Sequence, residues 1–260
     1  MHPLGHEPFL RAISEAPDDD APRLVFADWL DENSEPERAE FIRLQVRLAR
    51  APQEIAIEQR CEELLRANWP KWVITLHGTA ALWTEFTVSN RPTPGATRFE
   101  VGNEDGLFDT WIYCQSELKD WERGFPASVY VQGSSDLFLN YVNTIHEFVP
   151  VRRLRLMNLD DPDSLICTLA GVPLLQRVRD LMLRGVSIAD DAAVALANSP
   201  FASGLRLVSM IADHMSDRAG RAFAESPYLG GLESLHLLRN HFAGSVRSQL
   251  RSRFGFRVQC

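Results

Sequence analysis

The sequence predicts an α/β protein in which an N-terminal helical cap is followed by a short solenoid with parallel strands inside and helices outside. Two observations support this prediction. The second half of the chain repeats with a period of 27 residues, and a fixed period of this length indicates stacked supersecondary units. The first 50 residues instead carry apolar residues at helical spacing, which is typical of amphipathic helices.

The repeat is visible in five columns of residues that lie 27 positions apart. One column is proline, three are apolar and one is aspartate, so residues with different roles share the period. The columns are Pro173, Pro200 and Pro227; Val151, Val178, Leu205 and Leu232; Leu154, Leu181, Val208 and Leu235; Leu156, Leu183, Met210 and Leu237; and Asp136, Asp163, Asp190 and Asp217. Their agreement predicts about four to five stacked units in residues 124–260.

Each unit reads as a strand, a loop, a capped helix and a proline stop. Leu154 and Leu156 have the two-residue spacing of a strand with one buried face. The alanine-rich run 191–197 favours a helix, and Pro200 ends it because proline disfavours helical geometry in the residue before it. A carboxylate at a helix start accepts hydrogen bonds from free N–H groups of the first turn. We therefore predict four structural helix caps: Asp136, Asp163, Asp190 and Asp217.

This layout resembles leucine-rich repeats, and a 27-residue unit with a full helix resembles their ribonuclease-inhibitor-like class. The resemblance implies a horseshoe arc with its parallel strands on the inner side. Full units are expected to begin at Val151, Val178 and Leu205, with a shorter unit from Leu232. A degenerate unit is expected around residues 127–131. The third unit departs from the pattern at Asp213, and the asparagine of better-known family members occurs only at Asn240.

Residues 1–69 are predicted to form a helical domain. Arg38, Arg43, Arg47 and Arg50 are expected on the solvent side of its third helix, and a fourth helix is expected from about Gln53 to Ala67. Three segments resemble the repeat-companion domain found at the head of many planctomycete proteins. They are residues 17–32 (PDDDAPRLVFADWLDE), 38–45 (RAEFIRLQ) and 121–125 (WERGF). The resemblance implies a bacterial source and a helical domain preceding leucine-rich-like repeats, and it implies no catalytic residue.

Residues 70–123 are interpreted as an inserted, β-containing connector. Phe99 with Val101 and Trp111 with Tyr113 alternate like strands, and residues 103–106 between them read as a turn, so a hairpin is expected.

Composition and the N-terminal sequence predict the cellular compartment of the protein. The chain has 260 residues, of which 45% are hydrophobic, but no run approaches the roughly 20 apolar residues that span a membrane. Its first residues lack the basic start and apolar run of a signal peptide. The four cysteines have no CxxC spacing and are expected to be reduced thiols: Cys61, Cys114, Cys167 and Cys260. We therefore expect a cytoplasmic protein without a membrane partner.

The net charge of −8 is distributed unevenly along the chain. Residues 1–150 carry 13 basic and 25 acidic residues, whereas residues 151–260 carry 14 basic and 10 acidic residues. All 14 basic residues of the second half are arginine, which suits planar contacts with carboxylate or phosphate. These arginines are either solvated, or bind an acidic protein or a nucleic acid, or dock onto the acidic front of the chain itself.

No catalytic or metal-binding motif is present. The seven histidines lack HExxH or other ligand spacing, and neither GxSxG nor a P-loop occurs. The acidic cluster is interpreted as a solvated helix start: Asp18, Asp19, Asp20, Asp28, Asp31 and Glu32. Asp28 lies inside an apolar run, so we expect it to be partly buried and paired with Arg23 or Arg43. We expect no enzyme, cofactor, metal or small-molecule substrate.

The alternation of strand side chains predicts the functional surface. If Leu154 and Leu156 face the core, the residues between them and their equivalents in later units face the concave side. These residues are Arg153, Arg155, Met157, Asp180, Met182, Arg184, Leu207, Ser209, Ile211, Ser234, His236 and Leu238. Exposed apolar residues among them indicate an interface, unless a segment such as residues 70–123 covers them. We expect a protein-binding adaptor or scaffold. The alternatives are a nucleic-acid-associated accessory subunit and an enzyme with an unrecognised site.

Overall fold

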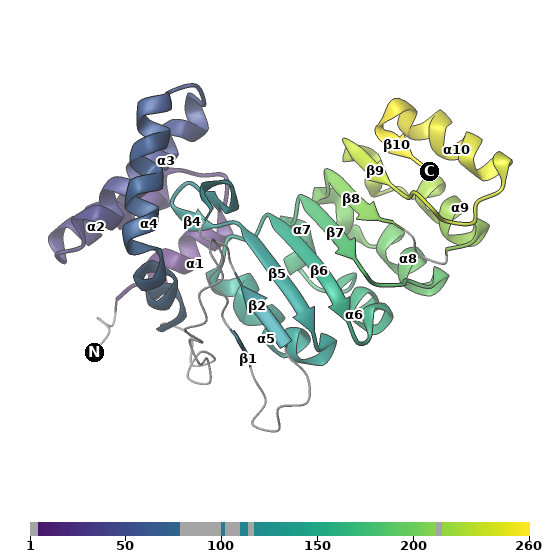
Figure 1. Cartoon of the computed structure of the whole chain (residues 1–260), viewed down its shortest axis with the longest axis horizontal. Helices are drawn as coiled ribbons and strands as arrows, with labels where there is room; N and C mark the ends of the chain where they lie inside the picture. The colour runs from purple at the N-terminus through teal and green to yellow at the C-terminus, as the bar shows by residue number, and fades with distance from the viewer. Residues whose placement is uncertain (1–4, 79–99, 102–109, 114–116, 212–214) are drawn as a thin grey trace. The chain divides into compact units, whose positions relative to one another are not determined.

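The computed structural model describes residues 5–78, 100–101, 110–113, 117–211 and 215–260 (Figure 1). The chain divides into two compact units. The helical unit contains residues 1–102, 113–129 and 143–151, and the sheet unit contains residues 103–112, 130–142 and 152–260.

Four helices build most of the helical unit: α1 (Glu7–Glu15), α2 (Ala21–Glu32), α3 (Pro36–Arg50) and α4 (Ile55–Gly78). The first three carry a proline at the first or second helical position, where a missing N–H costs no intrahelical hydrogen bond. Their apolar faces meet in one core that includes Ile13, Phe26 and Ile42. Helix α4 is longer than the sequence indicates, because it continues past residue 69.

The segment 121–125 packs into the core of this helical unit. It follows the 3-10 helix η2 (Leu118–Asp120) and includes β3 (Trp121–Glu122), which pairs with β4 (Phe125–Pro126). Gly124 has φ +91°, and a Cβ there would lie 2.5 Å from a side-chain atom of Ile42. Its N–H donates to Oε1 of Gln45 at 2.6 Å. A glycine is therefore required at 124 both by the backbone conformation and by the close approach to α3.

A parallel sheet runs through the sheet unit. Its strands are β5 (Ser128–Gly133), β6 (Arg153–Leu159), β7 (Asp180–Arg184), β8 (Leu207–Met210), β9 (Ser234–His236) and β10 (Val258–Gln259). They are neighbours in chain order and run in the same direction (Figure 1). The eight-stranded sheet order begins with β1 (Glu100–Val101) and β2 (Thr110–Tyr113). The two predicted hairpin strands are thus neighbours, while the predicted turn at 103–106 lies outside the described residues.

Helices alternate with these strands along the chain. The α-helices are α5 (Ser135–Phe148), α6 (Pro162–Leu169), α7 (Leu174–Arg177), α8 (Asp190–Ala197), α9 (Asp217–Glu225) and α10 (Gly244–Phe254). The 3-10 helices are η3 (Pro200–Gly204), η4 (Leu229–Gly231) and η5 (Gly255–Arg257). Helix α6 contacts α8, α8 contacts α9, and α9 contacts α10, so the helices form a second layer that advances in step with the strands.

The 27-residue period of the sequence determines the register of the sheet, because residues 27 positions apart pair across neighbouring strands. Arg153 pairs with Asp180, Asp180 with Leu207, and Leu207 with Ser234. The connections into the strands repeat as well: Arg179 N donates to Arg152 O, and Arg206 N donates to Arg179 O, each at 2.7 Å. Each strand therefore repeats the hydrogen bonding of its predecessor one unit later.

The four aspartates were predicted to cap their own helices, but the observed hydrogen bonds of three of them go to another helix. Asp190 and Asp217 are the first residues of their helices, and Asp163 is the second residue of α6, whose N-cap is Asp161. Each carboxylate instead accepts from the N-cap amide of the equivalent helix one unit later, so that α6 is joined to α8, α8 to α9 and α9 to α10. The bonds are Ala189 N to Asp163 Oδ1 at 2.8 Å, Ser216 N to Asp190 Oδ1 at 2.8 Å and Ala243 N to Asp217 Oδ1 at 2.7 Å. We call these three bonds the aspartate ladder.

Asp136 does not fit the ladder, because the corresponding donor position is Pro162, which has no N–H. Asp160 links these two units instead, since its Oδ1 accepts from Ser135 N at 2.8 Å. Burial acts to raise the pKa of Asp160, but the hydrogen bonds from Ser135 and Asp161 outweigh it and the pKa lies below its usual value. The first helix of the sheet unit is thus joined to the second by a different carboxylate.

Candidate interaction surface

The predicted concave residues lie on one face of the sheet, which we call the strand face. Leu154, Leu156 and Leu181 are buried to 2% exposure or less, as are the equivalent residues in later strands. Eleven of the twelve predicted residues are half-buried or exposed, and Ser209 is the exception at 4% exposure. Ser209 lies in register between Met182 and His236, both of which have longer side chains. The predicted strand phase is therefore the observed one.

Because the register is constant, the strand face consists of three rows that cross the strands. The first row is Arg153, Asp180, Leu207 and Ser234, and the middle row is Arg155, Met182, Ser209 and His236. Met157 pairs with Arg184, and Ile211 and Leu238 occupy the equivalent positions of the next two units, just beyond β8 and β9, so we assign these four residues to a last row. Neighbours within a row are about 5 Å apart, the spacing of adjacent strands.

The middle row holds an arginine in a defined orientation. The guanidinium carbon of Arg155 lies 5.3 Å from the ring centroid of Tyr130, and Nη1 lies 3.2 Å from Sδ of Met182. At the other end of the row, Nε2 of His236 is 2.8 Å from Oγ of Ser234. Along the row, the side chains change from the cation of Arg155 to the thioether of Met182, and then to the hydroxyl of Ser209 and the imidazole of His236.

The last row is the more exposed part of the strand face. Ile211 is 40% exposed and Leu238 is 38% exposed, and both lie beyond Arg184, which is also exposed. Within the described residues, the side chain of Arg184 makes no hydrogen bond or ion pair. The strand face therefore combines an arginine end with an apolar end.

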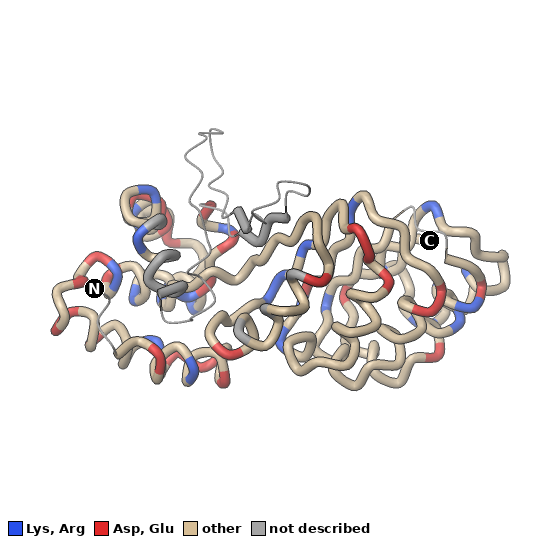
Figure 2. The backbone as a smooth tube through the Cα atoms, turned by 90° about the horizontal axis from the view of Figure 1, so that it is seen from below, with Lys and Arg blue, Asp and Glu red and all other residues tan. Residues whose placement is uncertain are grey.

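Charge on the sheet unit does not form a continuous basic stripe. Figure 2 shows lysine and arginine positions interspersed with acidic ones along the chain. Several arginines of the helical layer are held by local carboxylates or carbonyls; Arg218 pairs with Asp190 and Asp191, for example. The strand face itself carries three arginines and one aspartate, so it is net positive.

Part of the acidic cluster lies in the second half of α2 rather than at the predicted helix start, and it is held by surface ion pairs. Nη2 of Arg43 lies 2.7 Å from both Asp28 and Asp31, and these contacts raise the pKa of Arg43. The predicted Asp28–Arg43 pair is present, but the predicted burial of Asp28 is wrong, because its side chain is 72% exposed. In the described part of the chain, no group of three acidic, histidine or cysteine side chains is arranged to hold a metal ion.

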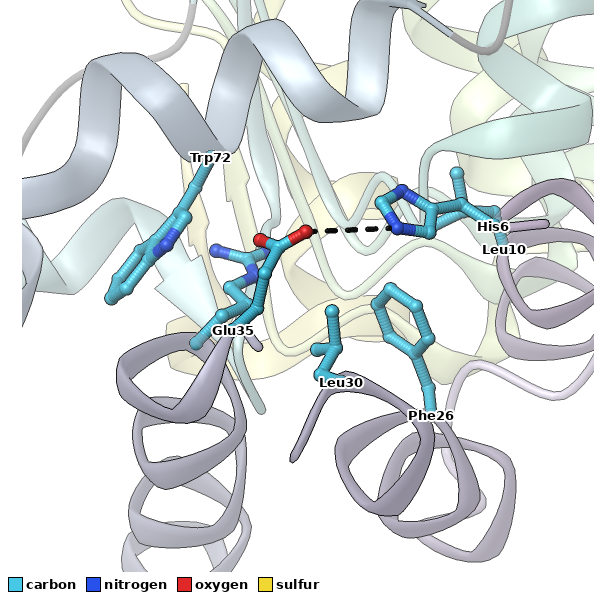
Figure 3. Close-up of a pocket in the computed structure, with 7 residues that line it drawn as sticks. His6, Leu10, Phe26, Leu30, Glu35 and Trp72 are labelled. Atoms are coloured by element: carbon cyan, nitrogen blue, oxygen red, sulfur yellow. Dashed lines mark ion pairs between the residues drawn. The ribbon is translucent and has the colours of Figure 1, made fainter. Parts of the chain in front are cut away.

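A buried polar cluster in the helical unit was not predicted. His6, Glu35 and Arg38 line a small cavity together with Leu10, Phe26, Leu30 and Trp72 (Figure 3). The Glu35 carboxylate points toward His6, with Oε1 3.9 Å from Nε2. The space is no larger than about one water molecule. Such a cavity has no room for an organic substrate.

Arg38 lies among aromatic rings rather than on the solvent side of α3. Its guanidinium carbon is 4.8 Å from the ring centroid of Trp72, 5.4 Å from that of Trp121 and 5.3 Å from that of Phe125. Burial lowers the pKa of Arg38 to about 9, and the carboxylate of Glu35 opposes this shift. The predicted exposure of Arg38 is therefore wrong, whereas Arg43, Arg47 and Arg50 are at least partly exposed.

The described cysteines are unpaired: Cys61, Cys167 and Cys260. Cys114 lies outside the described residues. Burial raises the pKa of Cys61 to about 12, so its thiol is protonated and unreactive near neutral pH.

Comparisons of the chain with protein-family models, with curated proteins and with solved structures found no match. Within the described ranges, no helix combines the length and the apolar character needed to cross a membrane.

Proposed function

We propose that the protein is a non-catalytic interaction module whose strand face binds a partner protein. The main support is the exposure of Ile211 and Leu238 at the end of a row that also contains Met157. Apolar side chains gathered on one exposed face favour a partner that removes them from water. The helical layer stabilises the strands that present them.

We further propose that the sheet unit is a leucine-rich-repeat solenoid of the ribonuclease-inhibitor-like class, preceded by a repeat-companion domain in a cytoplasmic bacterial scaffold protein. The 27-residue register supports the first part. Asn240 supports it as well, because its buried side chain donates to Met210 O and Leu237 O and accepts from Met215 N. The packing of segment 121–125 against α3 supports the second part, since both segments belong to the sequence resemblance.

The replacement Met182→Glu tests this function. Met182 lies in the middle of the strand face and is only half-buried, so a charge there is expected to block an apolar contact without unfolding the protein. Proteins captured by wild-type and variant chains from a bacterial lysate would be compared by mass spectrometry, together with thermal melting curves. We expect the specific partner to be lost with an unchanged melting temperature.

Tyr228→Glu is the matched control, because Tyr228 is an exposed apolar residue of the sheet unit outside the strand face. If both variants retain the same partners as the wild type, the strand face is not the binding surface. A nucleic-acid partner is a second candidate because every basic residue of 151–260 is arginine. It has less support, since Tyr130 beneath Arg155 is buried and offers no ring for base stacking.

A further inference from the structure

The chemistry of the strand face indicates what kind of partner segment it accepts. Arg155 supplies the first evidence. Its Nε is buried and has no hydrogen-bond partner among the described residues. In the described part of the chain, the acceptor for its Nη1 is the sulfur of Met182, which is a weak acceptor. Stacking on Tyr130 holds the guanidinium in place, so its donors are oriented but their hydrogen-bonding capacity is largely unused.

Arg184 supplies the second evidence. It lies on the neighbouring strand, two residues after Met182, which pairs with Arg155. From the strand spacing and the rise per residue, the Cα atoms of Arg155 and Arg184 are about 8 Å apart. Arginine side chains this close together can both reach one carboxylate or two adjacent ones. Neither arginine has a carboxylate partner within the described part of the chain.

The apolar end lies at a fixed distance from these arginines. Ile211 and Leu238 follow Arg184 in the last row, about 5 and 10 Å farther across the strands. An extended chain advances about 3.3–3.6 Å per residue. Side chains of an extended segment alternate between its two sides, so a residue two positions from a carboxylate over Arg155 and Arg184 faces the same surface. It lies about 7 Å farther on, over Ile211.

We propose that the strand face recognises an extended acidic segment of a partner protein, with an apolar residue two positions from the acidic one. This inference rests on the proposed protein-binding function and specifies its ligand chemistry. Carboxylate suits the planar fork of arginine, and the exposed Ile211 and Leu238 select a chain with apolar side chains over a uniformly charged polymer.

Synthetic peptides test the proposal. The probe is a fluorescein-labelled 12-residue peptide in which Glu and Leu are separated by one Ser residue, so that both face the same side of the extended chain. Its counterparts carry Lys in place of Glu, or Ser in place of Leu, and a single-stranded 12-nucleotide DNA serves as the competing polymer. Binding to the full chain is measured by fluorescence anisotropy. We expect the Glu/Leu peptide to bind at least tenfold more tightly than each of the other three probes.

Variants then locate the binding. Arg155→Met and Arg184→Met are each expected to weaken the Glu/Leu peptide at least tenfold, and Ile211→Ser is expected to reduce its advantage over the Glu/Ser peptide. Arg247→Met is the matched control, because Arg247 is an exposed arginine on α10. Arg184 is exposed, so its replacement tests the site even if Arg155→Met perturbs folding.

Several outcomes would overturn the proposal. These are no saturable binding of the Glu/Leu peptide up to millimolar concentration, equal binding of the Lys peptide, insensitivity to both arginine variants, or tighter binding of DNA. If capture of a partner still depends on Met182 in any of these cases, the protein-binding function stands and only the acidic chemistry fails. If capture does not depend on Met182, the proposed function fails as well.

Discussion

The guanidinium of Arg38 shows how one charged residue organises a core. It is 4% exposed and faces three aromatic rings from α4 and the segment 121–125. The electron-rich ring faces and the Glu35 carboxylate offset part of the cost of removing the cation from water. Arg38 therefore joins α3, α4 and the segment 121–125 within the helical unit.

Replacement of Arg38 by alanine is expected to lower the free energy of unfolding by about 3–5 kcal/mol, because it leaves a cavity among Trp72, Trp121 and Phe125 and removes the cation that these rings face. The matched control is Arg47→Ala on the same helix, whose exposed ion pair with Glu54 is worth at most about 1 kcal/mol. Urea denaturation of both variants measures the difference. Equal destabilisation would contradict the role assigned to Arg38.

Residue environments were only partly predictable from the sequence. The Asp28–Arg43 pair could be predicted because both residues lie on adjacent predicted helices. The burial of Arg38 could not be predicted, since its aromatic neighbours Trp72, Trp121 and Phe125 are distant from it in the chain. From an amphipathic pattern alone, a charged residue is predicted to be solvent-exposed unless its partner is known.

At the scale of secondary structure elements, the aspartate ladder couples each helix to the next. The carboxylate of Asp190 lies in the first turn of α8 and accepts from the N-cap amide of α9, so it belongs to two units at once. Its sequence period was predictable because three successive units make the same bond. The hydrogen-bond donor to Asp190 was not predictable, since periodicity fixes the phase of a residue but does not indicate which neighbouring unit it contacts.

Asp190→Ala is expected to destabilise the protein by about 0.5–2 kcal/mol, the usual cost of a lost helix cap. Asp191→Ala should cost less, because Asp191 is 84% exposed and pairs only with an exposed arginine. Thermal melting compares the two variants. Hydrogen exchange then separates the two cap assignments: faster exchange at the Ser216 amide supports the ladder, whereas faster exchange confined to the first turn of α8 contradicts it.

The strands were the most predictable elements. Buried leucines at Leu154 and Leu156 recur one period later at Leu181 and Leu183, and a one-residue slip would have moved them all to the exposed face. Residues 70–123 were the least predictable part, because no period or long amphipathic pattern constrains them.

At the scale of the whole molecule, the sheet unit needs its C-terminal end. Residues 232–260 form β9, α10 and β10, and they bury Leu235, Phe242 and Leu250 against the preceding unit. Deleting them would expose apolar residues of β8 and α9 to water, as happens when a repeat array loses its terminal unit. We expect this truncation to be insoluble or to lose its cooperative thermal transition. A soluble truncation with a sharp melting transition would show that the preceding units are stable alone.

The direction of the aspartate ladder has a consequence for biosynthesis. Each acceptor carboxylate precedes its donor amide in the chain, so the acceptor has already left the ribosome when the donor emerges. A nascent chain can therefore add one strand and one helix at a time onto a finished template, in the order of translation. Growth from the opposite end would have to wait for the last units, which are translated after all the acceptors.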